Sequence, residues 1–284
     1  MNLKLIHERK RFIMIKAIDW RFRPPYRSFK GSILYEKYGD NPAWPESVRK
    51  FSMDAMIKEM DENGIGIGMV SMRQGNDNDD IAKIKEEYPG RFLGMAHINP
   101  CDGQKALEDI DRYVVNGAAD TIIMEPGQFF IDDPMPADDP RCYPIYAKCE
   151  KEGIIVTLTF GGLFCHRLEN YNPIFIDRIA SDFPNLKIVI SHGGWPYVTE
   201  ICHVAYQHKN VYISPDYYFF KINPGFDQYV TAANNILQDQ ILFGSCFPSK
   251  PLDYAMDNIK NIGLTEETLE KVLYHNSAKL LGLE

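Results

Sequence analysis

The sequence predicts an α/β fold, namely a single-domain (β/α)8 TIM barrel, on the basis of three observations. Eight short apolar segments alternate with amphipathic helical segments along the chain. This alternation is typical of a parallel sheet whose two faces are both covered by helices. The chain has 284 residues, and single barrels often contain about 250. No composition break or low-complexity tract marks a second domain.

The first expected strand, Ile15–Asp19, is followed by a long connection and then by a helix over residues 52–64. Ser52 is a suitable N-cap for this helix, apolar residues recur at helical spacing, and Gly64 closes it. Pro89 and Gly90 end the next helix. Up to residue 127 the expected elements are strand 15–19, helix 52–64, strand 66–72, helix 79–90, strand 91–100, helix 103–117 and strand 119–127.

The second half of the chain repeats this rhythm. An open doubly wound sheet is the alternative, but no GxGxxG, GxxxxGKS or GxxxxGKT motif follows the first strand. The sequence therefore lacks the signature of the nucleotide-binding form of that sheet. The remaining expected elements are helix 142–153, strand 154–162, helix 172–184, strand 186–194, helix 198–208, strand 210–216, helix 226–237, strand 239–248 and two closing helices near 253–261 and 266–283.

Two connections are unusually long, residues 22–51 after the first strand and residues 126–141 after the fourth. Long loops in compact domains are often lids or binding loops, and loops after barrel strands lie on the active face. We therefore expect both connections to border the functional site.

Charge and composition exclude several classes of function. A net charge of -8 argues against broad electrostatic attraction to nucleic acid or to an anionic membrane. No apolar run approaches the ~20 residues of a transmembrane helix. Six scattered cysteines without a CxxC pair indicate reduced thiols and a cytoplasmic location.

The first residues stand apart from the barrel pattern. Residues 1–13 carry a charged stretch from His7 to Arg11, and neither an apolar segment nor a cleavage site follows it, so a signal peptide is not indicated. Met14 stands directly before the first strand. We expect residues 1–13 to form an N-terminal extension and residues 14–284 to form the barrel. An ordered cap under the barrel floor is the alternative for the extension.

Polar and ionisable side chains follow the expected strands. In a (β/α)8 barrel the active site is built from residues just after each strand. Such groups are unusual at the ends of apolar strands, so they favour a polar site at one end of the barrel. In chain order they are Asp19, Arg21, Arg23, Arg73, His97, Glu125, Thr159, His192, Asp216 and Cys246.

Four motifs carry a resemblance to a known family. The segments IDWRFRPP, SHGGWP, LFGSCFP and YHNSAKLLGL resemble signatures of the amidohydrolase-related family, within the amidohydrolase superfamily, and occur in the family's order. The similarity extends from Ile15 to Leu283. It implies an amidohydrolase-like barrel and one of the family's activities. These include metal-dependent hydrolysis, non-oxidative decarboxylation and hydrolysis by pyrone dicarboxylate lactonase-type enzymes.

The departures from the family's patterns concern its metal ligands. The family carries D-x-H-x-H after strand one, a histidine after strand five, S-H-x-G-G after strand six and F-G-S-D-x-P after strand eight. This chain has Arg21 and Arg23 at the first two histidines, Thr159 at the third and Cys246 at the aspartate. Only His192 matches its counterpart in the family.

These replacements argue against a catalytic metal. A guanidinium is permanently protonated and has no lone pair to donate to a metal. A zinc site needs about three protein ligands, and two arginines nearby would repel a cation. We therefore expect no metal cofactor. The alternative is one zinc ion held by His192, Cys246 and Glu125.

The two arginines instead suit the recognition of a small anion. Residues two apart on a strand point to the same face, so Arg21 and Arg23 are expected to share one site. Guanidinium groups bind a carboxylate bidentately and strongly. The alternative is a structural role, in which one or both form salt bridges with Asp19, Glu125 or Asp216.

Four residues are candidates for the chemical step. The ordinary pKa of a histidine side chain is near 6.5, which makes His192 suitable for proton transfer. Glu125 could activate water or hold an arginine, and Asp216 could orient His192 or Arg21. Cys246 could be a reactive thiolate with a depressed pKa beside the arginines, or a buried thiol that fills space. The predicted catalytic residues are His192, Glu125, Asp216 and Cys246, and the predicted substrate-binding residues are Arg21, Arg23, Asp19, Thr159, Trp195 and Tyr217.

These interpretations lead to three hypotheses of function. The first is a metal-independent lactonase that acts on a small carboxylated substrate, since lactone carbonyls need less Lewis-acid assistance than amides. The second is a non-oxidative decarboxylase of an aromatic or dienoic acid, as the resemblance allows. The third is an inactive barrel that binds an anion. In each case the expected partner is a small anionic molecule, with no nucleic acid or membrane, and a homodimer is possible.

Overall fold

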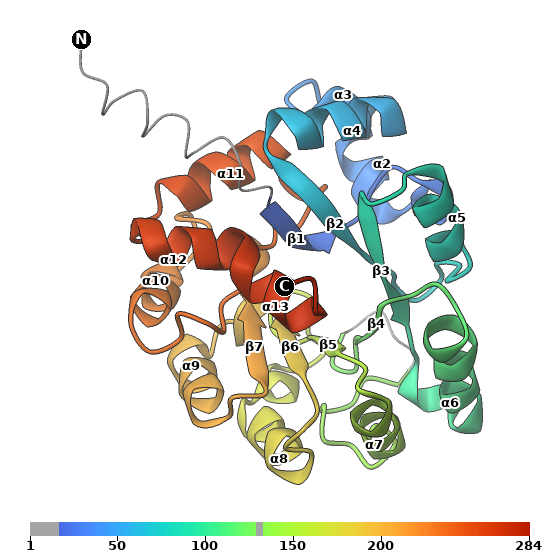
Figure 1. Cartoon of the computed structure of the whole chain (residues 1–284), viewed down its shortest axis with the longest axis vertical. Coiled ribbons are helices and arrows are strands. Elements are labelled where there is room, and N and C mark those ends of the chain that lie inside the picture. Colours follow the sequence, from blue (N-terminus) through green and yellow to red (C-terminus); the bar gives the residue numbers. More distant parts are fainter. Residues whose placement is uncertain (1–16, 129–132) are drawn as a thin grey trace.

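The computed structural model describes residues 17–128 and 133–284, which form a curled parallel sheet surrounded by helices (Figure 1). The strands follow one another around the sheet in chain order, and every neighbouring pair is parallel. This is the barrel architecture that the alternation of strands and helices predicts. The strands are β1 (Ala17–Phe22), β2 (Ile65–Ser71), β3 (Phe92–His97), β4 (Thr121–Met124), β5 (Val156–Thr159), β6 (Ile188–Ser191) and β7 (Val211–Ser214).

The α-helices lie on the outside of the sheet, except that the last one, α13, crosses one end of the barrel (Figure 1). They are α2 (Ile33–Gly39), α3 (Glu46–Arg49), α4 (Met53–Glu62), α5 (Asp80–Glu87), α6 (Gln104–Ile110), α7 (Tyr143–Glu152), α8 (Ile174–Asp182), α9 (Val198–Gln207), α10 (Phe226–Asn234), α11 (Leu252–Lys260), α12 (Glu266–Glu270) and α13 (Asn276–Leu281). Short helical turns are η1 (Arg27–Phe29), η2 (Pro100–Asp102), η3 (Asp111–Val115), η4 (Leu168–Tyr171), η5 (His192–Gly194), η6 (Asp216–Phe219) and η7 (Lys271–His275).

Two apolar layers hold the barrel together. The larger layer lies between the sheet and the outer helices. The smaller layer fills the barrel interior, and Ala278 and Leu280 of α13 close it from below. The interior is thus a packed core, as expected for a barrel of this size, and the ionisable groups predicted for the site lie toward the opposite, carboxyl end of the strands. The interior residues are Ile18, Trp20, Met69, Met95, Ile123, Ile155, Val189 and Leu242.

The expected eighth strand, residues 239–248, does not form a regular strand, so this prediction is wrong in detail. The segment still closes the ring. Ile241 forms a parallel bridge with Ile213 of β7, and Phe247 forms one with Phe22 of β1. The carbonyl of Phe243 also accepts a hydrogen bond of 2.8 Å from a backbone amide of β1. We refer to residues 241–247 as the closing segment.

Asp19 explains why the closing segment lacks a regular ladder. Its Oδ1 accepts hydrogen bonds from the backbone N–H of Ser245 at 2.8 Å and of Arg21 at 3.1 Å. A side chain therefore takes the place that a backbone carbonyl holds in a parallel ladder. The pairing register of β1 also shifts between Asp19 and Phe22.

Several boundaries differ from those expected. β1 continues to Phe22, so Asp19 and Arg21 lie inside the strand and not after it. The long connection 22–51 contains η1, α2 and α3 and is more ordered than a loop. The predicted extension 1–13 and part of the connection 126–141 lie outside the described residues.

Two expectations from composition can be compared with the described residues. All six cysteines are free thiols. Within residues 17–128 and 133–284, no helix has the length and apolar character needed to cross a bilayer.

Candidate active site

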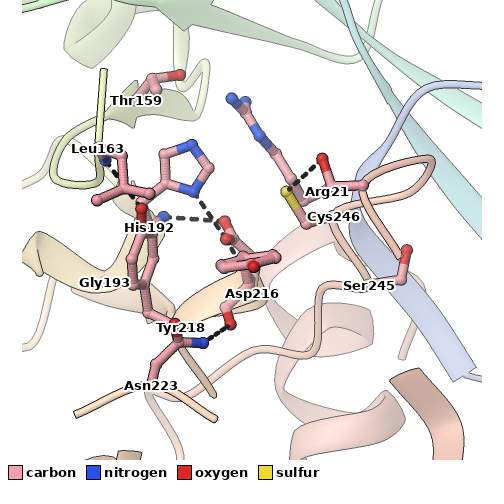
Figure 2. Close-up of polar contacts among 12 residues, drawn as sticks. Arg21, Thr159, Leu163, His192, Gly193, Asp216, Tyr218, Asn223, Ser245 and Cys246 are labelled. Atoms are coloured by element: carbon pink, nitrogen blue, oxygen red, sulfur yellow. Dashed lines mark hydrogen bonds and ion pairs between the residues drawn. The ribbon is translucent and has the colours of Figure 1, made fainter. Parts of the chain in front are cut away.

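The polar residues predicted from the strand ends converge at the carboxyl end of the barrel. Figure 2 shows Arg21 of β1, His192 after β6, Asp216 after β7 and Cys246 of the closing segment in one region, with the imidazole of His192 turned toward the carboxylate of Asp216. Thr159, the last residue of β5, lies beside them. These residues lie up to 225 positions apart in the sequence. They meet because all parallel strands end at the same rim of the barrel.

Three of these residues share an unusual backbone conformation. His192, Asp216 and Cys246 have φ angles of 64°, 42° and 56°, in the left-handed region. Few residues other than glycine adopt this region, and each such residue costs about 1–3 kcal/mol. Backbone strain of this kind clusters at functional sites, and here it marks the ends of three successive barrel segments.

His192 and Asp216 form a tightly held pair. The Nδ1 atom of His192 lies 2.7 Å from Oδ1 of Asp216, and the backbone N–H of His192 donates to Oδ2 at 2.9 Å. A carboxylate only accepts hydrogen bonds, so the proton of the neutral imidazole resides on Nδ1 and the lone pair on Nε2. Burial lowers the pKa of His192 below its ordinary value, although Asp216 opposes this effect.

Aromatic side chains support the outer side of this pair. Tyr218 packs edge-on against His192 with ring centroids 5.7 Å apart and stacks on Trp195 at 4.9 Å. Its hydroxyl accepts a hydrogen bond from the backbone N–H of Leu163. Trp195 donates from its indole to the carbonyl of Pro224, so its polar edge is used within the protein. Tyr218 was not among the predicted site residues.

Tyr217, a predicted substrate-binding residue, is half-buried at the edge of the site. Its ring lies edge-on to Tyr218 and Phe220, and the ammonium group of Lys250 lies 5.9 Å from its centre. Its backbone N–H donates to the carboxylate of Asp216. The backbone N–H of Tyr217 therefore helps to hold the carboxylate of the His192–Asp216 pair in place.

Glu125 lies at the centre of a second, positively charged group. Its carboxylate oxygens lie 3.8 Å from Nη2 of Arg21, 3.9 Å from Nε of Arg73 and 3.9 Å from Nε2 of His97. The hydroxyl of Thr159 donates to the same carboxylate at 3.3 Å. Glu125 thus holds an arginine, one of the two roles expected for it, and Thr159 supports Glu125.

The pKa shifts in this second group reflect burial and mutual repulsion. Burial would raise the pKa of Glu125, but the charges of Arg73, Arg21 and Arg23, together with His97 in its protonated form, outweigh burial and lower the pKa. Burial also lowers the pKa of His97, so the neutral imidazole is favoured. Arg73 has a lowered pKa, again mainly because it is buried.

Arg21 and Arg23 present hydrogen-bond donors that the described part of the chain does not satisfy. Arg21 is 1% exposed and Arg23 is 4% exposed. Nε and Nη1 of Arg21 and Nε of Arg23 are buried and have no hydrogen-bond partner among the described residues. Burial, together with the charges of Arg21 and Arg73, lowers the pKa of Arg23 to about 9. A buried guanidinium in this state needs an anion to compensate its charge.

Asp19, predicted to bind substrate, lies behind the site rather than facing it. It is 0% exposed, and its Oδ1 is used by the backbone amides of Arg21 and Ser245. Burial raises the pKa of Asp19 to about 7, against the effect of hydrogen bonds from Ser245 and Arg21. Its position favours a role in fixing Arg21 and the closing segment relative to each other.

Cys246 does not have the depressed pKa that its neighbours suggested. Burial and the charge of Asp216 raise the pKa of its thiol to about 11, and the opposing effects of Arg23 and Arg21 are smaller. The thiol is therefore protonated near neutral pH, which argues against a nucleophilic thiolate. Of the two alternatives for Cys246, this favours the buried thiol that fills space.

One group of side chains could hold a metal ion. His192, Asp216 and Cys246 each offer one ligand atom, and these atoms lie within 4.8 Å of one another. Glu125, expected as the third ligand of a zinc alternative, is not part of this group. Asp216 takes its place.

Arg73 and His97 were recognised at strand ends but received no predicted role. Both lie against Glu125 and are part of the charged group. Their roles depend on which strands are neighbours in the sheet, since β2, β3 and β4 are adjacent. The strand-end rule alone, applied to every strand equally, would have included them.

The sequence matches a family model described as amidohydrolase over residues 18–283. The chain belongs to the amidohydrolase family. Membership supports an enzyme of the amidohydrolase superfamily, with the reaction left open. A comparison with curated proteins gives no match.

Solved structures of other proteins share the whole barrel. An uncharacterized TIM-barrel protein from Bordetella bronchiseptica is 32% identical, with a TM-score of 0.85, 94% of this chain covered and 98% of that chain. A 2,6-dihydroxybenzoate decarboxylase from Rhizobium is 17% identical, with a TM-score of 0.70 and coverage of 95% and 99%. A dihydroxybenzoic acid decarboxylase from Polaromonas, with bound manganese and an inhibitor, is 17% identical, with a TM-score of 0.68 and coverage of 95% and 98%. At this identity the two decarboxylases support the fold alone.

Proposed function

We propose that this amidohydrolase is a metal-independent hydrolase of a small carboxylated substrate with a lactone or similar ester-type bond. One observation carries the proposal. The His192–Asp216 pair, with its Nδ1–Oδ1 distance of 2.7 Å, lies beside the buried Arg21 (Figure 2), and the charges of Arg21 and Arg23 both act on His192. Nε and Nη1 of Arg21 and Nε of Arg23 have no hydrogen-bond partner among the described residues. A base for water and a site for an anion therefore stand next to each other.

His192 suits the role of general base. Asp216 fixes the tautomer that leaves the Nε2 lone pair available. Because burial lowers the pKa of His192, the neutral and basic form persists at neutral pH. In hydrolysis His192 takes a proton from water while the water oxygen attacks the carbonyl carbon. The resulting imidazolium then returns the proton to the oxygen that leaves when the C–O bond breaks.

The chemistry of the donor groups fits a divalent metal ion poorly. Both carboxylate oxygens of Asp216 already accept hydrogen bonds from His192. The thiol of Cys246, with its pKa of about 11, would first have to lose a proton. The guanidinium groups of Arg21 and Arg23 face the same thiol and would repel a dication.

The experiment uses coumalate and γ-butyrolactone carboxylate, two small carboxylated lactones, with uncharged γ-butyrolactone as the matched control. Ring opening is followed by proton release in weakly buffered solution. We expect the carboxylated lactones to be opened with a far higher kcat/KM than the control, and we expect a strong chelator to leave the rate unchanged. Activity that disappears with the chelator and returns with zinc or manganese would refute the metal-independent mechanism.

A non-oxidative decarboxylase is the second candidate, because two relatives carry that activity in their names. Decarboxylation of an aromatic acid requires a proton donor for the developing carbanion, and the neutral His192 is better suited to accept a proton. Release of carbon dioxide from 2,6-dihydroxybenzoate without any lactone hydrolysis would favour this candidate. Binding of carboxylates without turnover of either substrate class would favour an inactive anion-binding barrel.

A further inference from the structure

We propose that the two arginines of the first strand divide the work: Arg23 anchors the substrate carboxylate, whereas Arg21 is a catalytic residue that stabilises the oxyanion formed at the attacked carbonyl. The inference rests on the proposed hydrolase function and assigns a separate task to each guanidinium. The difference between their surroundings supports this assignment.

Arg23 has a permanent need for a negative charge. It forms no ion pair with the described residues, and its Nε lacks a hydrogen-bond partner there. Glu125 affects the pKa of Arg23 less than burial, the two neighbouring guanidinium groups and Cys246 do. An anion that compensates Arg23 is needed in the ground state and in the transition state alike. The substrate carboxylate, which stays charged throughout, meets this need.

Arg21 is already balanced before the substrate binds. Its Nη2 lies 3.8 Å from Oε1 of Glu125, so its charge has a counterion within the fold, which it shares with Arg73. Because Arg21 is only 1% exposed, its side chain has little room to move. Nε and Nη1 remain without partners among the described residues. Donors that are fixed in advance and unsatisfied are those best able to stabilise a charge that develops only in the transition state.

The position of Arg21 agrees with this role. Figure 2 shows its guanidinium group between His192 and Thr159 on one side and Cys246 on the other. Its positive charge reaches both neighbours, since it contributes to lowering the pKa of His192 and opposes the raised pKa of Cys246. A carbonyl attacked by water from the His192 side would place its oxygen within reach of these donors.

The chemical step balances without another reactant. The water oxygen forms a bond to the carbonyl carbon, and its proton passes to Nε2 of His192. The π electrons of the carbonyl move to its oxygen, where Arg21 stabilises the negative charge. Collapse of this intermediate restores the carbonyl, breaks the ring C–O bond and returns the proton to the leaving oxygen. The product is a hydroxy acid with one carboxylate more than the substrate.

The two roles predict different kinetic effects. An interaction made equally in the ground and transition states affects KM, whereas one made only in the transition state affects kcat. With coumalate as substrate, Arg23→Gln should raise KM at least about tenfold and leave kcat within about threefold. Arg21→Gln should lower kcat by about 10²–10³-fold, as the loss of an oxyanion donor does, with little change in KM. Arg112→Gln, which removes an exposed arginine in η3 on the outside of the barrel, is the matched control and should change neither.

Binding of pyroglutamate, an unreactive lactam that carries a carboxylate, separates this inference from the proposed function. Calorimetry should show binding to the wild type and to Arg21→Gln, and strongly weakened binding to Arg23→Gln. Arg21→Lys keeps a positive charge opposite Glu125 but removes the Nε and Nη1 donors, so it tests the same point if Arg21→Gln unfolds. Equal loss of pyroglutamate binding in the Arg21 and Arg23 variants would overturn the division of roles.

The remaining outcomes bear on one claim or the other. If the wild type opens no lactone but binds pyroglutamate through Arg23 alone, the hydrolase proposal fails and the anchor assignment stands. If lactones are opened and Arg21→Gln retains wild-type kcat, the hydrolase stands and the oxyanion role of Arg21 is refuted. If the wild type binds no carboxylate at all, both claims fail.

Discussion

Asp216 holds His192 at two points, through its Oδ1 at 2.7 Å from Nδ1 and its Oδ2 at 2.9 Å from the backbone nitrogen. One carboxylate therefore fixes both the ring and the left-handed backbone of the same histidine. Because Asp216 itself is left-handed and completely buried, this geometry is set by the fold and does not depend on ligand.

Replacing Asp216 by Asn tests the pair. The amide can donate to Nδ1, so the ring proton can move to Nε2 and the lone pair needed for base catalysis is lost. We expect kcat for coumalate to fall by about 10²–10⁴-fold, since general bases and their orienting groups contribute effects of this size. Asp227→Asn, on the exposed face of α10, is the control and should retain full activity. A fully active Asp216→Asn enzyme would exclude His192 as the base.

The pH dependence of kcat/KM should report the lowered pKa of His192. A base must be deprotonated to act, and burial favours the deprotonated form. The midpoint of the decline in kcat/KM at acidic pH should therefore lie below about 6.5, the ordinary pKa of histidine. A midpoint above this value would contradict the assigned environment.

Asp19 should make the protein less stable as pH rises. Folding raises its pKa from 3.8 to about 7, so the folded state binds the proton more tightly than the unfolded state. The free energy of unfolding therefore decreases as pH rises from about 4 to about 7 and then levels off. At 1.36 kcal/mol per pKa unit, the total change is on the order of 4 kcal/mol.

Asp19→Asn provides the test, because its amide oxygen can still accept the two backbone hydrogen bonds but cannot ionise. Denaturant unfolding should show this variant to be more stable than the wild type at about pH 8 and similar to it at about pH 4. The exposed Asp54→Asn variant is the control and should follow the wild-type profile. A variant that is less stable than the wild type at the higher pH would contradict the prediction.

Glu125→Gln should destabilise the protein, and a bound carboxylate should restore part of the lost stability. The carboxylate lies near three nitrogen-bearing side chains at 3.8–3.9 Å. Its loss leaves buried guanidinium groups without a counterion, which costs about 3–5 kcal/mol. Added pyroglutamate should recover part of the lost thermal stability, because its carboxylate supplies the missing charge. Glu87→Gln, which removes an exposed partner of Arg27, should have little effect.

Gly244→Ala should damage the site more than the fold. A Cβ atom at this position would lie 2.9 Å from Oγ of Ser214, 3.0 Å from Cβ of Asp216 and 3.2 Å from Cβ of Arg21. The backbones that carry Asp216 and Arg21 would have to separate, so we expect kcat to fall at least about tenfold, since a misplacement of about 1 Å can cost 10²-fold. Gly39→Ala in α2 meets no atom within 4 Å and should be fully active.

The position of the site could be predicted from sequence because it follows from topology. Parallel strands that alternate with helices end at one rim, so residues such as His192 and Asp216 had to lie close together. Their direct contact, however, could not be predicted, because Arg21 was an equally suitable partner for Asp216. The distance between two side chains depends on the left-handed backbone at both positions, and nothing in the residue types indicates that conformation.

Other features could not be predicted because they arise from competition between interactions. Residues 239–248 have an apolar strand pattern, but the side chain of Asp19 takes the amide that a ladder would use. Cys246 has arginines nearby, yet burial outweighs their effect on its pKa. Both outcomes depend on how deeply a group is buried, which only the assembled barrel determines.

At positions 192, 216 and 246 the main chain itself limits which amino acids point mutation can introduce. Gly, Asn, Asp and His tolerate the left-handed region, whereas β-branched residues such as Val, Ile and Thr do not. Arg21, by contrast, lies in a strand whose extended backbone does not favour glycine over other residues. Substitutions in the first strand should therefore change the chemistry of this site more readily than substitutions at positions 192, 216 and 246.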